Sequence, residues 1–442
     1  MTAHTESTRT LSGAPLHLTE EEQSLLDGEA GEAMQFAMQL VVRAARLMEA
    51  PRLLEIGYVH IDACHYYGTA HVDFARFMVE RGARFEIPAW TNTVPASLVQ
   101  KEVREDADPV FLQEARELTD LYLAMGARPA WTCAPYQLPG SPGFGEHIVV
   151  GESNAVAYFN SAVGARTNRY GDFLDVACGL TRRAPEAGLH TDQGRRAEIQ
   201  IDLAEIPEAL RETELFCHVL GHAMGRLSGS KVPVITGLPA TTPKDSLKAL
   251  AAAGASSGGV GLFHAVGVTP EAPDLETALQ GHPPDAVHRV TPEDLVHARD
   301  SLSTAADGPV AMVAVGTPHF SFNEFGRLVD LLGHRRVHPE VAFYVSTSRH
   351  VAALAAEKGW FEILDKAGVT VLVDTCTYFT PAVRGCKGRV MTNSAKWAYY
   401  APGMLPVEVA FGSLEDCVET AVRGHVTRDP AAWSPRLWGT GG

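Results

Sequence analysis

Apolar and amphipathic stretches alternate along the last third of the chain. Three apolar runs each predict a strand: Val310–Val315, Ala342–Val345 and Val369–Val373. The unbroken run Val369–Val373 predicts a strand that is buried on both faces. Helix-like stretches separate them, and such β-α-β units require parallel strands with right-handed crossovers. Because loops leaving the carboxyl ends of parallel strands converge over one crevice, the three strand ends are expected to form one ligand-binding edge.

The first part of the chain shows the same alternation. Leu53–Ile61 is strand-like, and Trp131–Cys133 predicts a short strand that ends in a thiol. A further apolar run leads into Glu152 and Ser153, which predict a helix N-terminus with free N–H groups for an anion. The middle of the chain is less clear, and Gly281–Val290 is expected to be a surface connection.

These elements predict an α/β protein with a parallel-sheet core of several β-α-β units and ligand loops at one sheet edge. Residues 1–17 are predicted to be a disordered tail. Residues 18–442 are predicted to be one large folded region, with a sub-domain boundary near residues 281–309.

The composition narrows the function. Lys+Arg number 37 and Asp+Glu 53, a formal charge of -16, which argues against a nucleic-acid or anionic-membrane surface. No apolar run approaches the ~20 residues of a membrane span, and the first residues lack the apolar core of a secretory signal. The seven cysteines are scattered singly and do not form a disulfide framework. We therefore predict a cytoplasmic protein with no nucleic-acid or membrane partner, whose reduced thiols can bind iron.

The most reactive groups follow the Val369–Val373 strand. Asp374 and a hydroxyl precede Cys376, and the hydrogen-bonding run Thr392–Ser394 leads to Lys396. Thiol, amide, hydroxyl and ammonium groups delivered so closely together suit an anionic ligand beside a metal. The alternative is a buried cysteine that acts as a small hydrophobe and a solvated lysine.

Five short motifs carry thiol, carboxylate, hydroxyl, amide or ammonium groups of this kind. They are Thr132-Cys133-Ala134-Pro135-Tyr136, Glu152-Ser153-Asn154-Ala155, Gly316-Thr317-Pro318-His319, Asp374-Thr375-Cys376 and Thr392-Asn393-Ser394-Ala395-Lys396. In this order they resemble the aconitase X family, and the resemblance extends over roughly residues 20–424. It implies an aconitase-like core and, for residues 18–442, a catalytic domain of the aconitase X type. It also implies a hydro-lyase (a dehydratase) that uses an iron–sulfur cluster as Lewis acid.

By that resemblance, Cys133 and Cys376 are cluster ligands. The substrate-binding residues are expected to be Ala63, Cys64, His65, Asn92, Glu152, Ser153, Thr317, Asn393, Ser394 and Lys396. The chemistry agrees, because an iron with an open position can bind the departing hydroxyl of a β-hydroxy acid and soft thiolates suit such iron. Lys396 and Ser153 can stabilise the substrate carboxylate as it gains enolate character, which gives both a catalytic role.

The sequence leaves open which residue is the third cluster ligand. Where the phosphomevalonate branch of the family has a cysteine, this chain has Thr317. A hydroxyl there resembles the cis-3-hydroxy-L-proline branch and implies a two-iron or incomplete three- or four-iron cluster. Cys64 is the candidate for the third ligand and Cys386 the alternative, whereas the remaining cysteines lie in helical or apolar contexts typical of structural thiols.

The general base stays open as well. The family's small swivelling domain supplies a catalytic serine, and no part of this sequence resembles that domain, so we expect a separate small subunit. Within the chain, Ser153, His65 and His319 are alternatives, with His65 and Ser153 favoured. The expected substrate is a small β-hydroxy acid like cis-3-hydroxy-L-proline. The alternatives are another hydroxy acid, such as phosphomevalonate, and a binding or regulatory relative that has lost the cluster.

Overall fold

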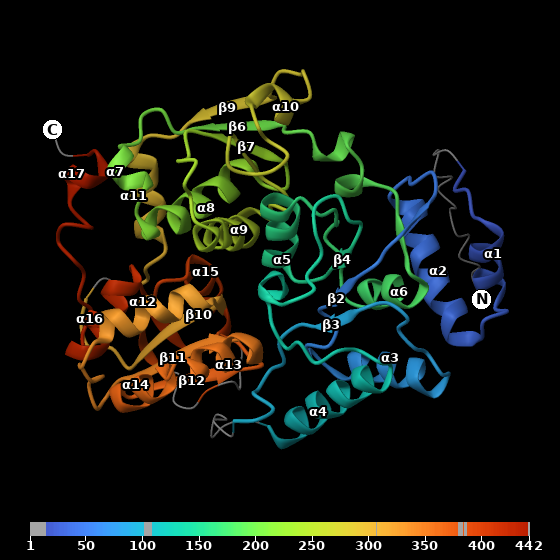
Figure 1. Ribbon diagram of the computed structural model, residues 1–442, viewed down its shortest axis with the longest axis horizontal. Coiled ribbons are helices and arrows are strands. Elements are labelled where there is room, and N and C mark those ends of the chain that lie inside the picture. The colour runs from blue at the N-terminus through green and yellow to red at the C-terminus, as the bar shows by residue number, and fades with distance from the viewer. Residues whose placement is uncertain (1–14, 101–107, 306, 379–382, 384–386, 441–442) are drawn as a thin grey trace, which may run out of the picture.

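The computed structural model describes residues 15–100, 108–305, 307–378, 383 and 387–440. Its elements form three successive α/β units, each built around a parallel sheet (Figure 1). The predicted α/β class is therefore confirmed. The extent of the predicted tail, of the folded region and of the sub-domain boundary stays a prediction.

The first unit surrounds the parallel sheet β3-β2-β4 and also contains the antiparallel pair β1 and β5. Its elements are α1 (Glu20–Asp27), α2 (Glu32–Leu47), β1 (Leu53–Glu55), β2 (Val59–Ile61), α3 (Thr69–Glu80), β3 (Ala89–Thr91), α4 (Pro109–Ala124), β4 (Val149–Val150), α5 (Ser153–Tyr158), α6 (Leu174–Thr181) and β5 (Arg183–Pro185). Apolar residues of α2, α3, α4 and α6 pack around β2 in one core.

Two strand predictions in this unit are wrong. Leu53–Ile61 is not one strand, because its two halves pair with different sheets, β1 with β5 and β2 with β3 and β4. Trp131–Cys133 is not a strand either. Trp131 has a left-handed backbone, with φ 43°, which interrupts the extended chain and delivers Cys133 on a loop. The predicted helix start at Ser153 is confirmed, with Glu152 as its N-cap.

The second unit contains the parallel sheet β8-β7-β6-β9. Its elements are β6 (Ile199–Asp202), α7 (Glu208–Arg211), α8 (Glu214–Ser228), β7 (Pro233–Thr236), α9 (Lys244–Gly258), β8 (His264–Ala265), α10 (Leu275–Leu279), β9 (Ala286–Arg289) and α11 (Pro292–Ser301). The expected surface connection Gly281–Val290 is wrong, because it contains β9. The strand has no continuous apolar run to indicate it, because β9 lies at the edge of the sheet and its residues are alternately half-buried and exposed.

Helices α8 and α9 approach each other closely in this unit. A Cβ atom on Gly258 would lie 1.8 Å from the carbonyl oxygen of Gly225, so only glycine permits the contact. Both helices contribute to a core that continues into the third unit.

The third unit has the five-stranded sheet β12-β11-β10-β13-β14, and all its pairs are parallel. Its elements are β10 (Met312–Phe320), α12 (Phe322–Leu332), β11 (Ala342–Thr347), α13 (Arg349–Glu357), α14 (Trp360–Ala367), β12 (Val369–Val373), β13 (Gly388–Thr392), α15 (Ala395–Met404), β14 (Val407–Phe411), α16 (Leu414–Arg423) and α17 (Pro435–Trp438). The apolar runs arise because both faces are buried. Val313 and Val315 contact the core with α12, α13, α14 and α16, whereas Met312 and Ala314 face the core shared with α8, α9 and α15.

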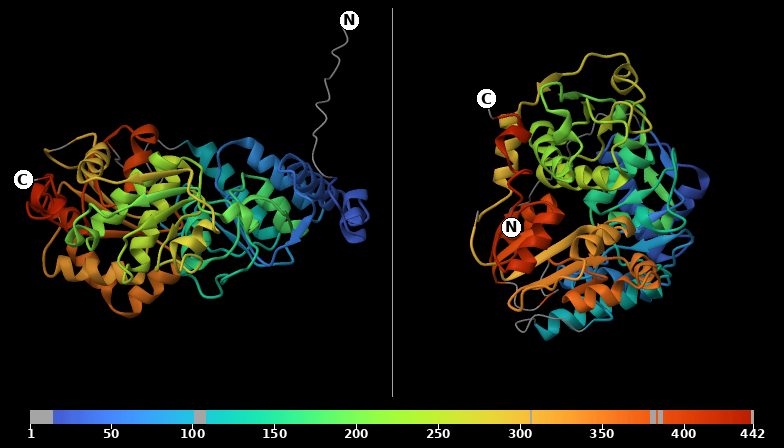
Figure 2. Two further views of the ribbon diagram at one scale, coloured as in Figure 1. Left: turned by 90° about the horizontal axis from the view of Figure 1, so that it is seen from above. Right: turned by 60° about the vertical axis from the view of Figure 1, so that its left-hand side comes forward.

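The three units lie side by side, with the first and third units meeting below the second unit in the view of Figure 1; Figure 2 gives two further views. Direct hydrogen bonds join the first and third units, such as that from the Val94 N–H to the Asp374 carbonyl at 2.8 Å. Among the described helices, none combines the length and the apolar character that crossing a bilayer requires.

Candidate active site

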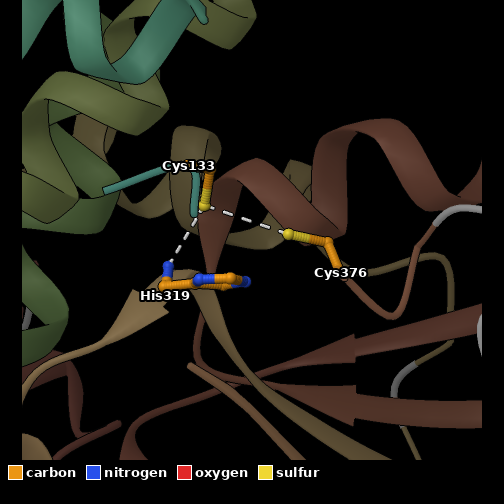
Figure 3. Close-up of side chains that lie close together, drawn as sticks. All are labelled: Cys133, His319 and Cys376. Atoms are coloured by element: carbon orange, nitrogen blue, oxygen red, sulfur yellow. Dashed lines mark hydrogen bonds between the residues drawn. The ribbon is translucent and has the colours of Figure 1, made fainter. Parts of the chain in front are cut away.

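Two buried thiols from different units meet at the junction. The Sγ atoms of Cys133, on a loop of the first unit, and Cys376, just after β12, lie 3.9 Å apart (Figure 3). That distance is far too long for a disulfide. Two thiolates bound to one tetrahedral metal at about 2.3 Å would lie about 3.8 Å apart. The pair therefore fits a shared metal.

The protonation of the pair also suits a metal. Burial raises the pKa of the Cys133 thiol, but the hydrogen bond with Cys376 and the charge of Lys396 outweigh burial and hold that pKa below its usual value. The same hydrogen bond and burial raise the pKa of Cys376. Cys133 is thus the more readily deprotonated of the two thiols, and a bound metal cation can take the place of a thiol proton.

His319 lies within the same group, since its ligand atom and the two sulfurs are all within 4.8 Å of one another. However, both ring nitrogens are already engaged. Nε2 lies 3.1 Å from the Thr375 carbonyl oxygen, which can only accept, so Nε2 carries the proton. Nδ1 lies 2.9 Å from the Thr132 hydroxyl and accepts from it. We therefore infer that His319 orients the loops and, through its backbone N–H, donates to the Cys133 sulfur at 3.3 Å.

A polar cavity of about 250 Å³ lies at the same junction. It is lined by Asp62, His65, Tyr67, Asn92, Gly151, Glu152, Ser153, Tyr378, Lys396, Tyr400 and Met404. Five predicted site residues are thus brought together: His65, Asn92, Glu152, Ser153 and Lys396. They come from the ends of β2 and β3, the start of α5 and the first turn of α15.

An ion pair crosses the cavity between the first and third units. The Lys396 ammonium donates to Oε1 of Glu152, and both side chains are buried. Glu152 also accepts from Asn154 Nδ2 at 2.8 Å and from Asn92 Nδ2 at 3.1 Å. Burial raises the pKa of Glu152, but the Lys396 charge and these donors outweigh it and lower the pKa to about 2. Burial lowers the pKa of Lys396 less than Glu152 raises it, so both groups are charged.

His65 and Asp62 line the other side of the cavity. His65 Nδ1 lies 3.0 Å from the Thr93 carbonyl, so Nδ1 carries the proton and Nε2 the lone pair. Burial lowers the pKa of His65 to about 4, so the ring is neutral at pH 7. Burial and the nearby Glu152 charge raise the pKa of Asp62 well above its usual value. Sequence reasoning missed Asp62, although it follows β2 directly, just as Asp374 follows β12.

The other predicted site residues have different surroundings. The Cys64 thiol donates to the Ile61 carbonyl at 3.2 Å and does not join the group of Cys133, His319 and Cys376. Cys386 lies outside the described residues. The predicted metal role of Cys64 stays a prediction.

Five predicted substrate contacts lie outside the cavity lining: Cys64 and the four residues described next. The Asn393 amide donates to Glu214 at 3.0 Å. Ser394 caps α15 and donates to the Thr317 carbonyl. The buried Thr317 hydroxyl has no hydrogen-bond partner among the described residues, and the Ala63 N–H donates to Asp175 at 3.2 Å. Their contact with substrate stays a prediction.

The parallel sheets and the thiol pair beside a charged cavity define an α/β protein of the aconitase-like class. Models of the aconitase X first, second and third domains match residues 15–193, 196–300 and 310–423. The chain belongs to the aconitase X family. The resemblance seen in the five motifs is confirmed.

Individual relatives cover most of the chain. It is 43% identical over 416 residues to the cis-3-hydroxy-L-proline dehydratase of Pseudomonas aeruginosa, covering 93% of this chain and 71% of that protein. It is 38% identical over 426 residues to the cis-3-hydroxy-L-proline dehydratase of Hypocrea jecorina, covering 95% and 71%. It is 33% identical over 390 residues to the phosphomevalonate dehydratase large subunit of Thermococcus kodakarensis, covering 87% and 95%.

A solved structure gives the same result for the fold. The holo-form of Thermococcus kodakaraensis aconitase X superposes with a TM-score of 0.80 at 29% identity, covering 92% of this chain and 100% of that one. The predicted aconitase-like core is confirmed. The predicted reaction class, a hydro-lyase, is confirmed as well, because these curated relatives are dehydratases.

Proposed function

We propose that this protein removes water from a small β-hydroxy amino acid, with cis-3-hydroxy-L-proline favoured, and that an iron–sulfur cluster bound by Cys133 and Cys376 assists. The observation that carries the proposal is the thiol pair, 3.9 Å apart, at the junction that also holds the charged cavity. The names of the Pseudomonas aeruginosa and Hypocrea jecorina relatives support the choice of substrate.

The charges in the cavity favour an amino acid over a phosphorylated acid. Lys396 is the one charged cation among its described lining residues, because His65 is neutral. One ammonium suits one carboxylate, whereas a phosphate together with a carboxylate would need more positive charge. Asp62 and Glu152 can accept hydrogen bonds from a ring ammonium. Phosphomevalonate, on which the Thermococcus kodakarensis relative acts by its name, fits these charges less well.

The cluster ligands come from both sides of the junction. Cys133 and Cys376 suit iron because soft thiolates are its preferred ligands in clusters. When bound, the cluster would supply a Lewis acid for the departing hydroxyl. Within the part of the chain that the structure describes, the group has two thiols, which suits a two-iron or incomplete three- or four-iron cluster. Cys64 would have to turn from the Ile61 carbonyl to become the third ligand.

The chain's own residues would bind and polarise the substrate. Lys396, held by Glu152, would attract the substrate carboxylate, and the Ser153 hydroxyl at the start of α5 would donate to it. Elimination also needs a base within ~3 Å of the proton that is removed. His65 Nε2 carries a lone pair, and Ser153 lies in the same cavity, so both are candidates.

Alternatively, we propose that the base that removes the proton belongs to a separate small subunit, which caps the cavity. Several curated relatives matched over almost their whole length are called large subunits, including those of Thermococcus kodakarensis and Methanocaldococcus jannaschii. The cavity rim includes exposed Tyr67 and Met404, which such a subunit would cover.

The test is anaerobic purification, iron and sulfide quantification, and a screen for loss of water. Cis-3-hydroxy-L-proline, its trans isomer and phosphomevalonate are each supplied to the chain with and without a candidate small subunit. The expected result is bound iron and water loss from the cis isomer. Iron-free protein that dehydrates it equally well, or turnover of phosphomevalonate alone, would contradict the proposal.

A further inference from the structure

A buried carboxylate lies two residues before Cys376. Asp374 follows β12, has no exposed surface and has a left-handed backbone, with φ 73°, which is unfavourable for a residue other than glycine. Its Oδ1 accepts from Arg349 Nε at 2.6 Å, and its Oδ2 accepts from Arg349 Nη2 at 2.8 Å. Oδ2 also accepts from the Leu98 N–H at 3.1 Å. Such a turn persists only where its surroundings hold it in place.

The backbone segment that Asp374 contacts through Leu98 leads to the cavity. The segment that contains Leu98 begins at Asn92, which lines the cavity, and the Thr93 carbonyl holds the His65 ring. Val94 N–H donates to the Asp374 carbonyl at 2.8 Å. At the far end, the Gln100 amide accepts from Val373 N–H at 3.0 Å and donates to the Val371 carbonyl. The segment is thus fixed along the outer edge of β12, which is an edge strand.

In the chain direction, Asp374 leads to the thiol pair. Asp374 is followed by Thr375, whose carbonyl accepts from His319 Nε2 at 3.1 Å, and then by Cys376. The turn at Asp374 therefore determines where the Cys376 sulfur lies relative to Cys133 and relative to the Asn92 segment.

We propose that the Arg349–Asp374 ion pair is a positioning element that couples the Cys376 ligand to the substrate-binding segment that begins at Asn92. This rests on the proposed function. Arg349 is 42% exposed on its side chain, so solvent screens the pair's direct contribution to stability. Without Arg349, however, the Asp374 carboxylate keeps only the Leu98 N–H among these donors, and the left-handed turn can relax. Both Cys376 and the Asn92 segment then shift.

The test compares Arg349→Ala with Arg335→Ala. Arg335 pairs with Glu419 in the same unit, has a similarly exposed side chain, at 39%, and lies outside the site, which makes it a matched control. In anaerobically loaded protein, Arg349→Ala is expected to release iron to a chelator ~10-fold faster than wild type, the scale for removing a residue behind a metal ligand. It is also expected to bind cis-3-hydroxy-L-proline more weakly, as measured by the spectral change on titration. Arg335→Ala should match wild type in both.

A second measurement needs no metal. Mild oxidation of the iron-free protein joins Cys133 and Cys376 in a disulfide, with transfer of two electrons and two protons to the added oxidant, and its rate reports how closely the sulfurs approach. This rate is expected to be lower in Arg349→Ala than in wild type and in Arg335→Ala. Arg349→Lys, which keeps the charge without the two-pronged contact, should lie between them and serves if the alanine variant does not fold.

The outcomes separate the two proposals. Wild-type protein that takes up no iron contradicts the proposed function, and the disulfide rate then still decides the positioning role. Iron release, substrate binding and disulfide rate that are all unchanged in Arg349→Ala overturn the positioning role while the proposed function stands. A change in iron release without a change in substrate binding overturns the coupling.

Discussion

Lys396 and Glu152 are opposite charges buried side by side, and each keeps the other ionised. Lys396→Ala should leave iron uptake intact but weaken substrate binding or turnover by about 2–5 kcal/mol, the range for breaking a buried charge pair. Iron content, KM and kcat measure this. Lys358→Ala, at the exposed end of α13, is the control. Near-normal kinetics in Lys396→Ala would contradict a role of this lysine in substrate binding.

The Glu152 carboxyl should also make stability depend on pH. Its folded pKa of about 2 lies below the ordinary 4.5, so its stabilising effect is complete above about pH 4.5 and is lost as the pH falls towards 2. Glu152→Gln is expected to lower the free energy of unfolding at pH 7 by about 3–5 kcal/mol, because it leaves Lys396 buried and unpaired. Urea denaturation between pH 7 and 2 should show this difference shrinking below pH 4.5. A difference that stays constant would argue against the ionised pair.

The two thiols that we propose as metal ligands should be individually necessary. Cys133→Ser and Cys376→Ser are each expected to abolish the visible thiolate-to-iron band while the far-UV circular dichroism stays native, because each removes one of two convergent sulfurs. Cys178→Ser, buried in α6, is the control and should keep the band. Cys64→Ser should lose less iron than either, because its thiol faces the Ile61 carbonyl. If it loses as much, Cys64 is the third ligand.

At the scale of elements, the ends of parallel strands and helix starts were predictable. The apolar run of β12 indicated that Asp374 and Cys376 follow a buried strand, and the polar residues after the run near Val150 indicated the start of α5. Such signals are local, so one sequence carries them. The contacts of His319 with Thr132 and Thr375 are not local, and only the packed structure reveals that both ring nitrogens are engaged. The direction of the Cys64 thiol likewise depends on a turn that its sequence does not fix.

The start of α15 offers an element-scale test. Ser394 accepts from the Trp397 N–H at 3.1 Å and donates to the Thr317 carbonyl, so it fixes the turn that presents Lys396. Ser394→Ala should cost about 1 kcal/mol of stability, as loss of an N-cap does, and should also weaken substrate binding. Ser413→Ala removes the comparable cap of α16, away from the cavity. It should show a similar stability loss in urea denaturation without the binding defect. Equal binding in both variants would contradict the role of this turn.

At the scale of the whole molecule, the site exists only because the first and third units meet. Cys133, Asn92 and Glu152 come from one unit, and Cys376 and Lys396 come from the other, with more than two hundred residues of chain between the two thiols. The sequence predicted the parallel strands of the third unit and five of the eleven residues that line the cavity. It could not place Asp62 or Tyr378 in the cavity, because no periodic pattern indicates which loops from separate units face each other.

The exposed cavity rim predicts a partner at this scale. Adding the small subunit should raise turnover of cis-3-hydroxy-L-proline and protect Tyr67 and Met404 from surface labelling, because both are exposed in the isolated chain. Full turnover by the monodisperse chain alone would contradict the need for the subunit. His65→Ala and Ser153→Ala would then identify the base within the chain.

The central claim is that the thiol pair holds iron within reach of a substrate in the adjacent cavity. Titrating anaerobic, iron-loaded protein with cis-3-hydroxy-L-proline, while following the thiolate-to-iron absorption, tests it most directly and does not depend on a partner. We expect a saturable change in the band in wild type, a weaker one in Lys396→Ala and no band in Cys133→Ser or Cys376→Ser. A band that persists in both cysteine variants, or that does not respond to substrate at all, would contradict the claim.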